Sequence, residues 1–304
     1  QHVRSFEKAL SGYAHNEPMS RYLTRFFKEN KQMGSSDRKM TSRFIYNYFR
    51  LGHALKEQNL LDRLCYAEFL CESDSPLVSL NFPELADEIS NPLIQKIQLL
   101  ESKVSFDSNQ IFPLLENLSE SMDKKGFLHS HFVQPDLFIR IKRGQEDFVK
   151  STLDQHDIAY TAFSLKTLSL PNGFRLQDFP KLEGKFEVQD LSSQKTIEFM
   201  EATAKENWWD ACAASGGKAL MLLDKYPNLN LLVSDIRLSI LRNLNDRFDK
   251  AEVRSPRRQK ILDLTADTTE ILGNEEFDGI ILDVPCTGSG TWGRTPEMIQ
   301  QMTM

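Results

Sequence analysis

The sequence predicts an α+β protein of several domains: a helical region over residues 1–125, a small α/β segment over 126–185 and a larger α/β domain over 186–304. Two observations carry this prediction. Apolar and aromatic residues recur at helical spacing through the first region, whereas short apolar runs bounded by turn residues alternate with helical stretches afterwards. In addition, 304 residues are more than one compact domain usually contains.

Composition narrows the class of protein. The chain is 40% hydrophobic and 26% charged, which is ordinary for a globular protein. It has no apolar run near the roughly 18 residues that a membrane-spanning helix needs, and it begins without the apolar core of a signal peptide. The four cysteines form no C-x-x-C pair, and His129 and His131 lack further ligands, so we expect free thiols and no metal. These features predict a cytoplasmic protein, which we expect to be a monomer.

Charge is distributed unevenly along the chain. The net charge is −6, yet residues 1–60 carry 11 Lys and Arg against 5 Asp and Glu, a net of +6. A basic amino-terminal region on an acidic body suits an enzyme that holds a polyanion such as RNA at one face. The alternative is a solvated helical surface without a partner.

The helical region begins with a strongly amphipathic stretch over residues 21–28. Tyr22, Leu23, Phe26 and Phe27 share one side of this helix, and the other side carries the candidate RNA-binding residues Arg21, Arg25 and Lys28. Gly34-Ser-Ser36 ends it and offers an N-cap for a second helix from Asp37 to about Leu55. We expect further helices near 59–71, 84–101 and 110–122.

The small α/β segment carries a second group of candidate phosphate contacts. We expect strands over 136–141 and 158–163, with a helix over 145–155 between them. The candidate RNA-binding residues here lie close together at the end of the first strand: Arg140, Lys142 and Arg143.

The last domain is organised around a glycine-containing turn over residues 210–218. The apolar run Asn207-Trp-Trp209 reads as a strand and 219–223 as a helix, and a further helix is expected over 194–205. Glycines let the backbone approach a ligand closely, and a helix N-terminus presents free N–H groups to a carboxylate or phosphate. The turn matches neither the dinucleotide fingerprint nor the phosphate-binding Walker loop.

Acidic residues follow the next predicted strands in order. Asp235 ends the strand over 231–234, Asp267 lies beyond a strand over 261–264, and Asp283 ends a strand over 277–282. In a doubly wound sheet, an acid at the second position typically holds ribose hydroxyls. A glycine turn followed by these acids is the layout of an S-adenosylmethionine site. The alternative, that each Asp is a helix cap or turn residue, explains their ordered placement less well.

Two motifs resemble a known family. Asp210-x-Cys-Ala-Ala-x-Gly-Gly-Lys218 is followed, 73 residues from its first Asp, by Asp283-x-Pro-Cys286-x-Gly-x-Gly290. This ordered pair is similar to the Sun/Fmu (RsmB-type) RNA cytosine-C5 methyltransferases, as are Trp292-x-Arg294-x-Pro296-Glu297 and residues 186–194. The family has Pro where this chain has Ser215, a change that can loosen the turn. The resemblance implies a NusB-like helical bundle, an RRM-like α/β segment and a Rossmann-like methyltransferase domain.

The resemblance also implies a role for each residue of the site. The methionine end of S-adenosylmethionine would be cradled by Cys212, Ala213, Ala214, Ser215, Gly216, Gly217 and Lys218. Asp235 would hold the ribose hydroxyls and Asp267 the adenine amino group, and Asp283 would lie between the methyl group and the target cytosine. The implied substrate is RNA, most simply ribosomal RNA, with its cytosine unpaired or flipped out.

The residues around Cys286 and the family resemblance predict different roles for this cysteine. From the residues, a cysteine after Pro285 at a strand end, beside Asp283, is the candidate nucleophile that attacks cytosine C6. In the family, this cysteine assists product release, and the nucleophile belongs to a later Thr-Cys-Ser motif. That motif does not occur in these 304 residues, and the chain stops soon after the fourth strand. We therefore expect an unfinished catalytic domain that is inactive as it stands.

Two other functions are compatible with the sequence. A DNA cytosine-C5 methyltransferase would use Cys286 as its nucleophile, although it would normally carry a different first motif and no basic helical front region. A non-catalytic RNA-binding or ribosome-assembly protein is the second. Methyl transfer from labelled S-adenosylmethionine to ribosomal RNA, to duplex DNA or to neither separates the three.

Overall fold

A computed structural model describes residues 1–175, 178–253 and 257–302. The chain forms two compact units, which are described separately. The first unit combines residues 1–135 with 287–304, and the second comprises residues 136–286. Within the described ranges, no helix is both long and apolar enough to cross a membrane.

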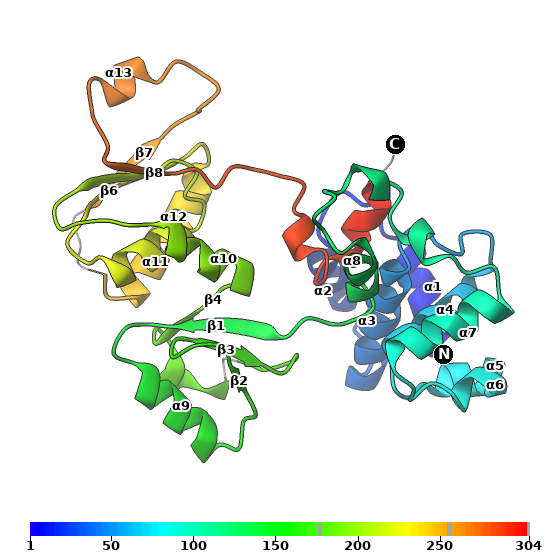
Figure 1. Ribbon diagram of the computed structural model, residues 1–304. Helices are drawn as coiled ribbons and strands as arrows, with labels where there is room; N and C mark the ends of the chain where they lie inside the picture. The colour runs from blue at the N-terminus through cyan, green and yellow to red at the C-terminus, as the bar shows by residue number, and fades with distance from the viewer. Residues whose placement is uncertain (176–177, 254–256, 303–304) are drawn as a thin grey trace. The chain divides into compact units, whose positions relative to one another are not determined.

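The predicted helical region over residues 1–125 lies in the first unit and is helical, whereas residues 287–304, which were expected in the last α/β domain, group with this unit as well. Its helices are α1 (His2–Ser11), α2 (Met19–Glu29), α3 (Ser35–Arg50), α4 (Leu60–Cys71), α5 (Pro76–Asn81), α6 (Pro83–Ala86), α7 (Leu93–Lys103) and α8 (Lys124–Ser130) (Figure 1). The aromatic stripes predicted to be buried form part of the core, where Phe26, Phe44 and Phe49 are at most 6% exposed. Tertiary packing therefore uses the apolar face of α2 and leaves its basic face outside.

Two predicted helices of this unit are wrong. The helix expected over 84–101 is broken into α6 and α7, because Pro92 directly precedes α7 and cannot donate the backbone bond that would continue a helix through it. The helix expected over 110–122 is replaced by two short 3-10 turns over Ser108–Ile111 and Leu115–Asn117. Pro113 lies between them, and the apolar spacing alone did not reveal this break.

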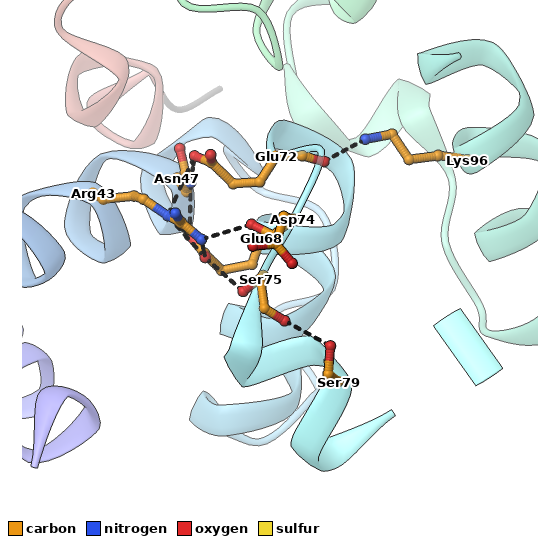
Figure 2. Close-up of polar contacts among 8 residues, drawn as sticks. All are labelled: Arg43, Asn47, Glu68, Glu72, Asp74, Ser75, Ser79 and Lys96. Atoms are coloured by element: carbon orange, nitrogen blue, oxygen red, sulfur yellow. Dashed lines mark hydrogen bonds and ion pairs between the residues drawn. The ribbon is translucent and has the colours of Figure 1, made fainter. Parts of the chain in front are cut away.

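A buried carboxylate joins α3, α4 and α5. Glu68 is fully buried and forms an ion pair with Arg43; it also accepts hydrogen bonds from Asn47 Nδ2 at 2.7 Å and Ser75 Oγ at 2.9 Å (Figure 2). Lys96 of α7 donates to the carbonyl of Glu72 at 2.8 Å at the edge of this cluster. A buried charge is tolerable only when such partners replace water, so these bonds hold the helices in one arrangement.

The second unit contains a small antiparallel sheet covered by one helix. Strands β1 (Leu137–Ile141), β2 (Thr161–Ala162), β3 (Thr167–Leu170) and β4 (Phe186–Val188) pair in the order β2-β3-β1-β4. Helix α9 (Glu146–Gln155) lies on one face of this sheet (Figure 1). Its Val149 and Leu153 belong to the same buried cluster as Ile139 and Leu168 of the strands. The strand predicted over 158–163 is only two residues long (β2). The strand predicted over 136–141 (β1) and the helix predicted over 145–155 (α9) agree with the structure.

The same unit contains a parallel four-stranded sheet. Strands β5 (Asn207–Asp210), β6 (Asn230–Asp235), β7 (Arg257–Ile261) and β8 (Gly279–Ile281) lie in the order β7-β6-β5-β8. Helices α11 (Gly217–Lys225) and α12 (Leu238–Lys250) supply the core beside these strands, and the short α13 (Thr269–Leu272) sits on the excursion between β7 and β8 (Figure 1). In chain order the sheet reads 3-2-1-4, the arrangement of a Rossmann-type half.

Two elements of this domain differ from prediction. The third strand is Arg257–Ile261 and ends where the predicted strand began, because the polar run pairs in register with β6 as an edge strand. The helix expected over 194–205 is only α10 (Leu191–Lys195) and a 3-10 turn over Thr196–Phe199. In both places backbone pairing or a turn prevailed over the apolar pattern.

Candidate functional site

The strand order predicts a ligand crevice outside the carboxyl end of β5. The chain leads from β5 to β6 on one side, while the later strand β8 pairs in parallel with β5 on the other side, so the order of the strands reverses between β5 and β8. Ligands of open α/β sheets bind outside the carboxyl ends of the strands at this position. Asp210 is the last residue of β5, and Asp283 follows β8. The two acids therefore flank the crevice.

The glycine turn between β5 and α11 is held in a conformation that only glycine fits. Gly216 has φ of 82°, and a Cβ there would meet Leu244 Cγ and Phe248 Cε2 at 2.8 Å each. Ser215, where the family has Pro, is anchored: Arg247 Nη1 donates to its Oγ at 2.7 Å and to its carbonyl at 3.0 Å. Arg247 thus supplies a restraint that the backbone of a proline would otherwise supply.

Asp235 joins the end of β6 to this turn. Its Oδ2 accepts the Ala214 N–H at 3.1 Å, and its Oδ1 accepts the backbone N–H of Arg237 at 2.9 Å and the Arg237 Nε at 3.0 Å. Burial acts to raise the pKa of Asp235, but the bonds from Arg237 and Ala214 outweigh it and the pKa is lowered. The carboxylate is therefore ionised at neutral pH and can accept hydrogen bonds from hydroxyl groups.

Lys218 and Asp283 form an ion pair across the crevice. Lys218 projects from the first turn of α11, and its side chain is 17% exposed against 56% for Asp283. A cation held beside the loop after β8 offsets the negative charge that Asp210, Asp235 and Asp283 bring to one place.

Asp210 is a buried acid whose carboxylate oxygens lack hydrogen-bond partners in the described part of the chain. It is 1% exposed, and within the described ranges neither carboxylate oxygen has a partner at hydrogen-bonding geometry. Burial, and then the Asp283 carboxylate, raise the pKa of Asp210 to about 7, against the opposing charge of Lys218 and the nearby backbone N–H of Ala219, which does not reach full hydrogen-bonding geometry. An orphaned carboxyl at this position fits the ammonium group of a methionine moiety, which would supply the missing donors and the missing charge. The residues of the crevice therefore fit S-adenosylmethionine. Asp210 was missed as a site residue, although its place at a strand end before a glycine turn was a usable signal.

The two cysteines of the motifs have different surroundings. Burial, followed by the charges of Asp235, Asp210 and Asp283, raises the pKa of the Cys212 thiol, which disfavours a thiolate. Cys286 is exposed on the loop after β8. Of the two, Cys286 is the thiol that a substrate can reach.

Asp267 does not converge with the other acids. It lies exposed beyond β7, and its Oδ1 accepts the Thr269 N–H at 2.9 Å at the start of α13. Hydrogen bonds from Thr269 lower the pKa of Asp267. The contact that the structure shows is an Asx turn directly before α13, and a turn role was part of the alternative interpretation of this residue.

The predicted phosphate contacts of the small sheet need correction. Arg140 is 6% exposed; its Nη1 donates to Asp224 Oδ2 of α11 at 3.1 Å and its Nε to Gln189 at 3.0 Å. Lys142 donates to the Gly184 carbonyl at 2.6 Å. These cations are already paired inside the protein and cannot also bind phosphate without leaving buried acids unpaired. The side chain of Arg143 is exposed.

The basic face of α2 is at the surface as predicted. Arg21, Arg25 and Lys28 are all exposed, and Arg25 forms ion pairs with Glu17 at 2.5 Å and Glu29 at 4.0 Å. Exposed pairs of this kind are weak and can exchange for phosphate. Among the described residues, no group of three or more His, Cys, Asp or Glu could hold a metal ion.

Comparisons with known proteins match the part of the chain that carries these motifs. Residues 197–303 match the family described as "16S rRNA methyltransferase RsmB/F". Two relatives named "Ribosomal RNA small subunit methyltransferase B" are 34% identical over 136 residues (Xylella fastidiosa) and 26% identical over 220 residues (Yersinia pseudotuberculosis). The matches cover 45% and 67% of this chain, but only 30% and 49% of those relatives.

One solved structure shares the fold over almost the whole chain. The crystal structure of PH0851 superposes with a TM-score of 0.67 at 18% identity, covering 99% of this chain and 78% of that one. At this identity the likeness concerns the fold alone. Residues 197–303, which carry both motifs, are therefore similar to the RsmB/F methyltransferases, and this similarity supports a Sun/Fmu-type S-adenosylmethionine-dependent methyltransferase domain.

Proposed function

We propose that this protein methylates C5 of cytosine in RNA, with ribosomal RNA as the substrate. The observation that carries the proposal is the crevice at the carboxyl end of β5, where an orphaned Asp210 lies beside the Lys218–Asp283 pair. The names of the relatives, which are ribosomal RNA methyltransferases, support RNA as the substrate class.

In this proposal the chain's own residues hold the cofactor in a fixed orientation. S-adenosylmethionine supplies an electrophilic methyl group. The turn over residues 212–218 would surround its methionine end, with the ammonium group at Asp210. Asp235 would take the ribose hydroxyls after Arg237 moves aside; that side chain is 59% exposed, so the exchange is easy. Asp267 would reach the adenine amino group only by leaving its bond to Thr269.

The chemistry at the base requires a thiolate, because C5 of cytosine is a poor nucleophile. A cysteine sulfur forms a bond to C6, C5 then accepts the methyl group, and loss of the C5 proton to a base returns the electrons that expel the sulfur. We assign the attacking sulfur to the cysteine of the later family motif, and release of the product to Cys286. Asp283, held by Lys218, would lie beside the target base. Phosphates would be contacted by the exposed face of α2 (Arg21, Arg25 and Lys28) and by Arg143.

One experiment tests the reaction. Tritium from methyl-labelled S-adenosylmethionine should enter ribosomal RNA when the full-length protein is present. Transfer to duplex DNA instead would support a DNA methyltransferase, and transfer to neither would support a non-catalytic RNA-binding protein; either result overturns the proposal.

A second experiment tests the role of Cys286. If Cys286 only assists release, Cys286→Ala should still attack C6 and transfer methyl but fail to eliminate. A stable protein–RNA adduct would then accumulate as a slow band on a denaturing gel. A variant that forms no adduct and transfers no methyl would make Cys286 the nucleophile.

A further inference from the structure

The segment that follows the Cys286 loop is built into the core of the helical unit. Trp292 is 3% exposed and Ile299 is fully buried, and both belong to the core cluster that contains Leu51 and Phe112. The rings of Trp292 and Phe112 lie 5.4 Å apart. We call residues 291–301 the anchored segment.

Polar bonds hold the anchored segment to α3. Arg50, which is 1% exposed, donates to the carbonyl of Gly293 at 2.9 Å and to that of His131 at 2.7 Å. A second contact joins His53 Nε2 to the carbonyl of Ile299 at 3.1 Å. A buried guanidinium has no water to replace these acceptors, so movement of Gly293 away from Arg50 is costly.

Glu297 connects the anchored segment to α2. It is 1% exposed, and its Oε1 accepts the N–H of Met19, the first residue of α2, at 3.0 Å. Pro18 at the N-cap supplies no capping side chain, so Glu297 takes that role from 278 residues away. The carboxylate also lies at the positive end of the helix dipole. Its Oε2 has no partner among the described residues, so the bond to Met19 is the contact that holds this buried group.

The anchored segment begins close to the catalytic motif in sequence. Cys286 ends the second unit and Thr287 begins the part of the chain that returns to the first. Five residues separate Cys286 from Trp292, and the six steps between these two positions, at roughly 3.3–3.6 Å each, span at most about 22 Å. The loop that carries Cys286 therefore has one end on β8 and the other on a segment fixed to α2 and α3.

We infer that Glu297 is a positioning residue that couples the start of α2 to the loop over residues 283–290. The inference rests on the proposed function, because α2 carries the cations assigned to RNA and the loop carries Asp283 and Cys286. RNA bound to α2 would shift this helix, whose first N–H is hydrogen-bonded to Glu297. Glu297 belongs to the anchored segment, so the segment would move with α2 and change the position of the loop. The same contacts restrain α2 when the loop is occupied, since coupling between two sites is reciprocal.

Hydrogen exchange tests the coupling without any need for activity. In the full-length protein, Glu297→Ala, which removes the acceptor, should speed amide exchange about fivefold in the first turn of α2, the usual effect of a lost cap, and also in residues 291–295. Glu116→Ala is the matched control, because that carboxylate is 94% exposed, and it should change neither region. Faster exchange in α2 alone would overturn the inference, since Glu297 would then be a local cap. Arg50→Lys loosens the anchored segment at Gly293 instead of at Glu297. It should speed amide exchange in α2 as well as in residues 291–295, and an unchanged exchange rate in α2 would also overturn the inference.

A double-mutant cycle on methyl transfer gives an independent readout. Single-turnover rates at saturating RNA and S-adenosylmethionine are compared for wild type, Arg21→Glu, Glu297→Ala and the double variant. Coupling predicts that the double variant loses less than the product of the two single fold-losses. A loss equal to the product would overturn the inference. If the wild-type protein transfers no methyl, the proposed function is overturned instead. The hydrogen-exchange experiment would still decide whether the coupling exists.

Discussion

Asp210 makes the stability of the protein depend on pH in a way that can be calculated from its burial. The ordinary aspartate pKa of 3.8 is raised to about 7 in the folded protein, chiefly because the carboxyl is buried. A difference of about 3 pH units corresponds to about 4 kcal/mol, since each unit is worth about 1.4 kcal/mol. This figure is an upper bound for the cost of ionising Asp210 in the folded state without a ligand.

The sign follows from proton binding. Between pH 3.8 and about 7 the folded protein keeps a proton on Asp210 that the unfolded chain has lost. The folded state then binds more protons, so the free energy of unfolding falls as pH rises through this window. Asp210→Asn mimics the protonated acid and removes this dependence. We expect the variant to be up to about 4 kcal/mol more stable than wild type at pH 8 and nearly equal to it at pH 4.

Urea unfolding at a series of pH values measures this difference. Asp249→Asn is the control, because the Asp249 side chain is 79% exposed, and its stability should follow that of wild type at every pH. Calorimetry should show that Asp210→Asn also weakens S-adenosylmethionine binding by about 1.5–3 kcal/mol, the value of a charge-assisted bond. A stability difference from wild type that does not change between pH 4 and pH 8 would refute the reasoning.

Three further predictions concern the turn, the helical core and the ribose acid. Gly216→Ala should lower the free energy of unfolding by about 2–5 kcal/mol from left-handed strain and overpacking, whereas Gly144→Ala, with φ of 77° and open space around it, should cost only about 1–2 kcal/mol; equal losses in urea unfolding would remove the steric argument. Glu68→Ala should cost about 3 kcal/mol, near the lower end for a broken buried pair because the Arg43 side chain is 27% exposed, and a thermal shift near zero would contradict it. Asp235→Ala should weaken S-adenosylmethionine binding by about 1.5–3 kcal/mol in calorimetry, while Arg237→Ala should change it by less than about 0.5 kcal/mol; an unaltered affinity for Asp235→Ala would withdraw that residue from the site.

The sequence by itself determined the features that depend on local chemistry. The amphipathic spacing of residues 21–28 predicted α2 and its exposed cations, and the apolar runs around residues 207 and 231 predicted β5 and β6. The glycine turn and the acids after the strands indicated an S-adenosylmethionine site, because close backbone approach and charge require particular residue types at particular places. Such requirements concern the residue type at a single position, so they can be recognised before the fold is known.

Tertiary structure alone decided which charges are available and which are consumed. Arg140 and Arg21 are the same residue type in similar basic clusters, yet Arg140 is buried against Asp224 and Arg21 is exposed. Equally, the Asp210 oxygens are left without a partner at hydrogen-bonding geometry while Asp267 accepts a turn bond from Thr269, and Glu297 caps a helix that begins 278 residues earlier. These differences arise from desolvation and from contacts between residues distant in the chain. Both depend on what surrounds a side chain in three dimensions, which the spacing of residues along the sequence does not specify.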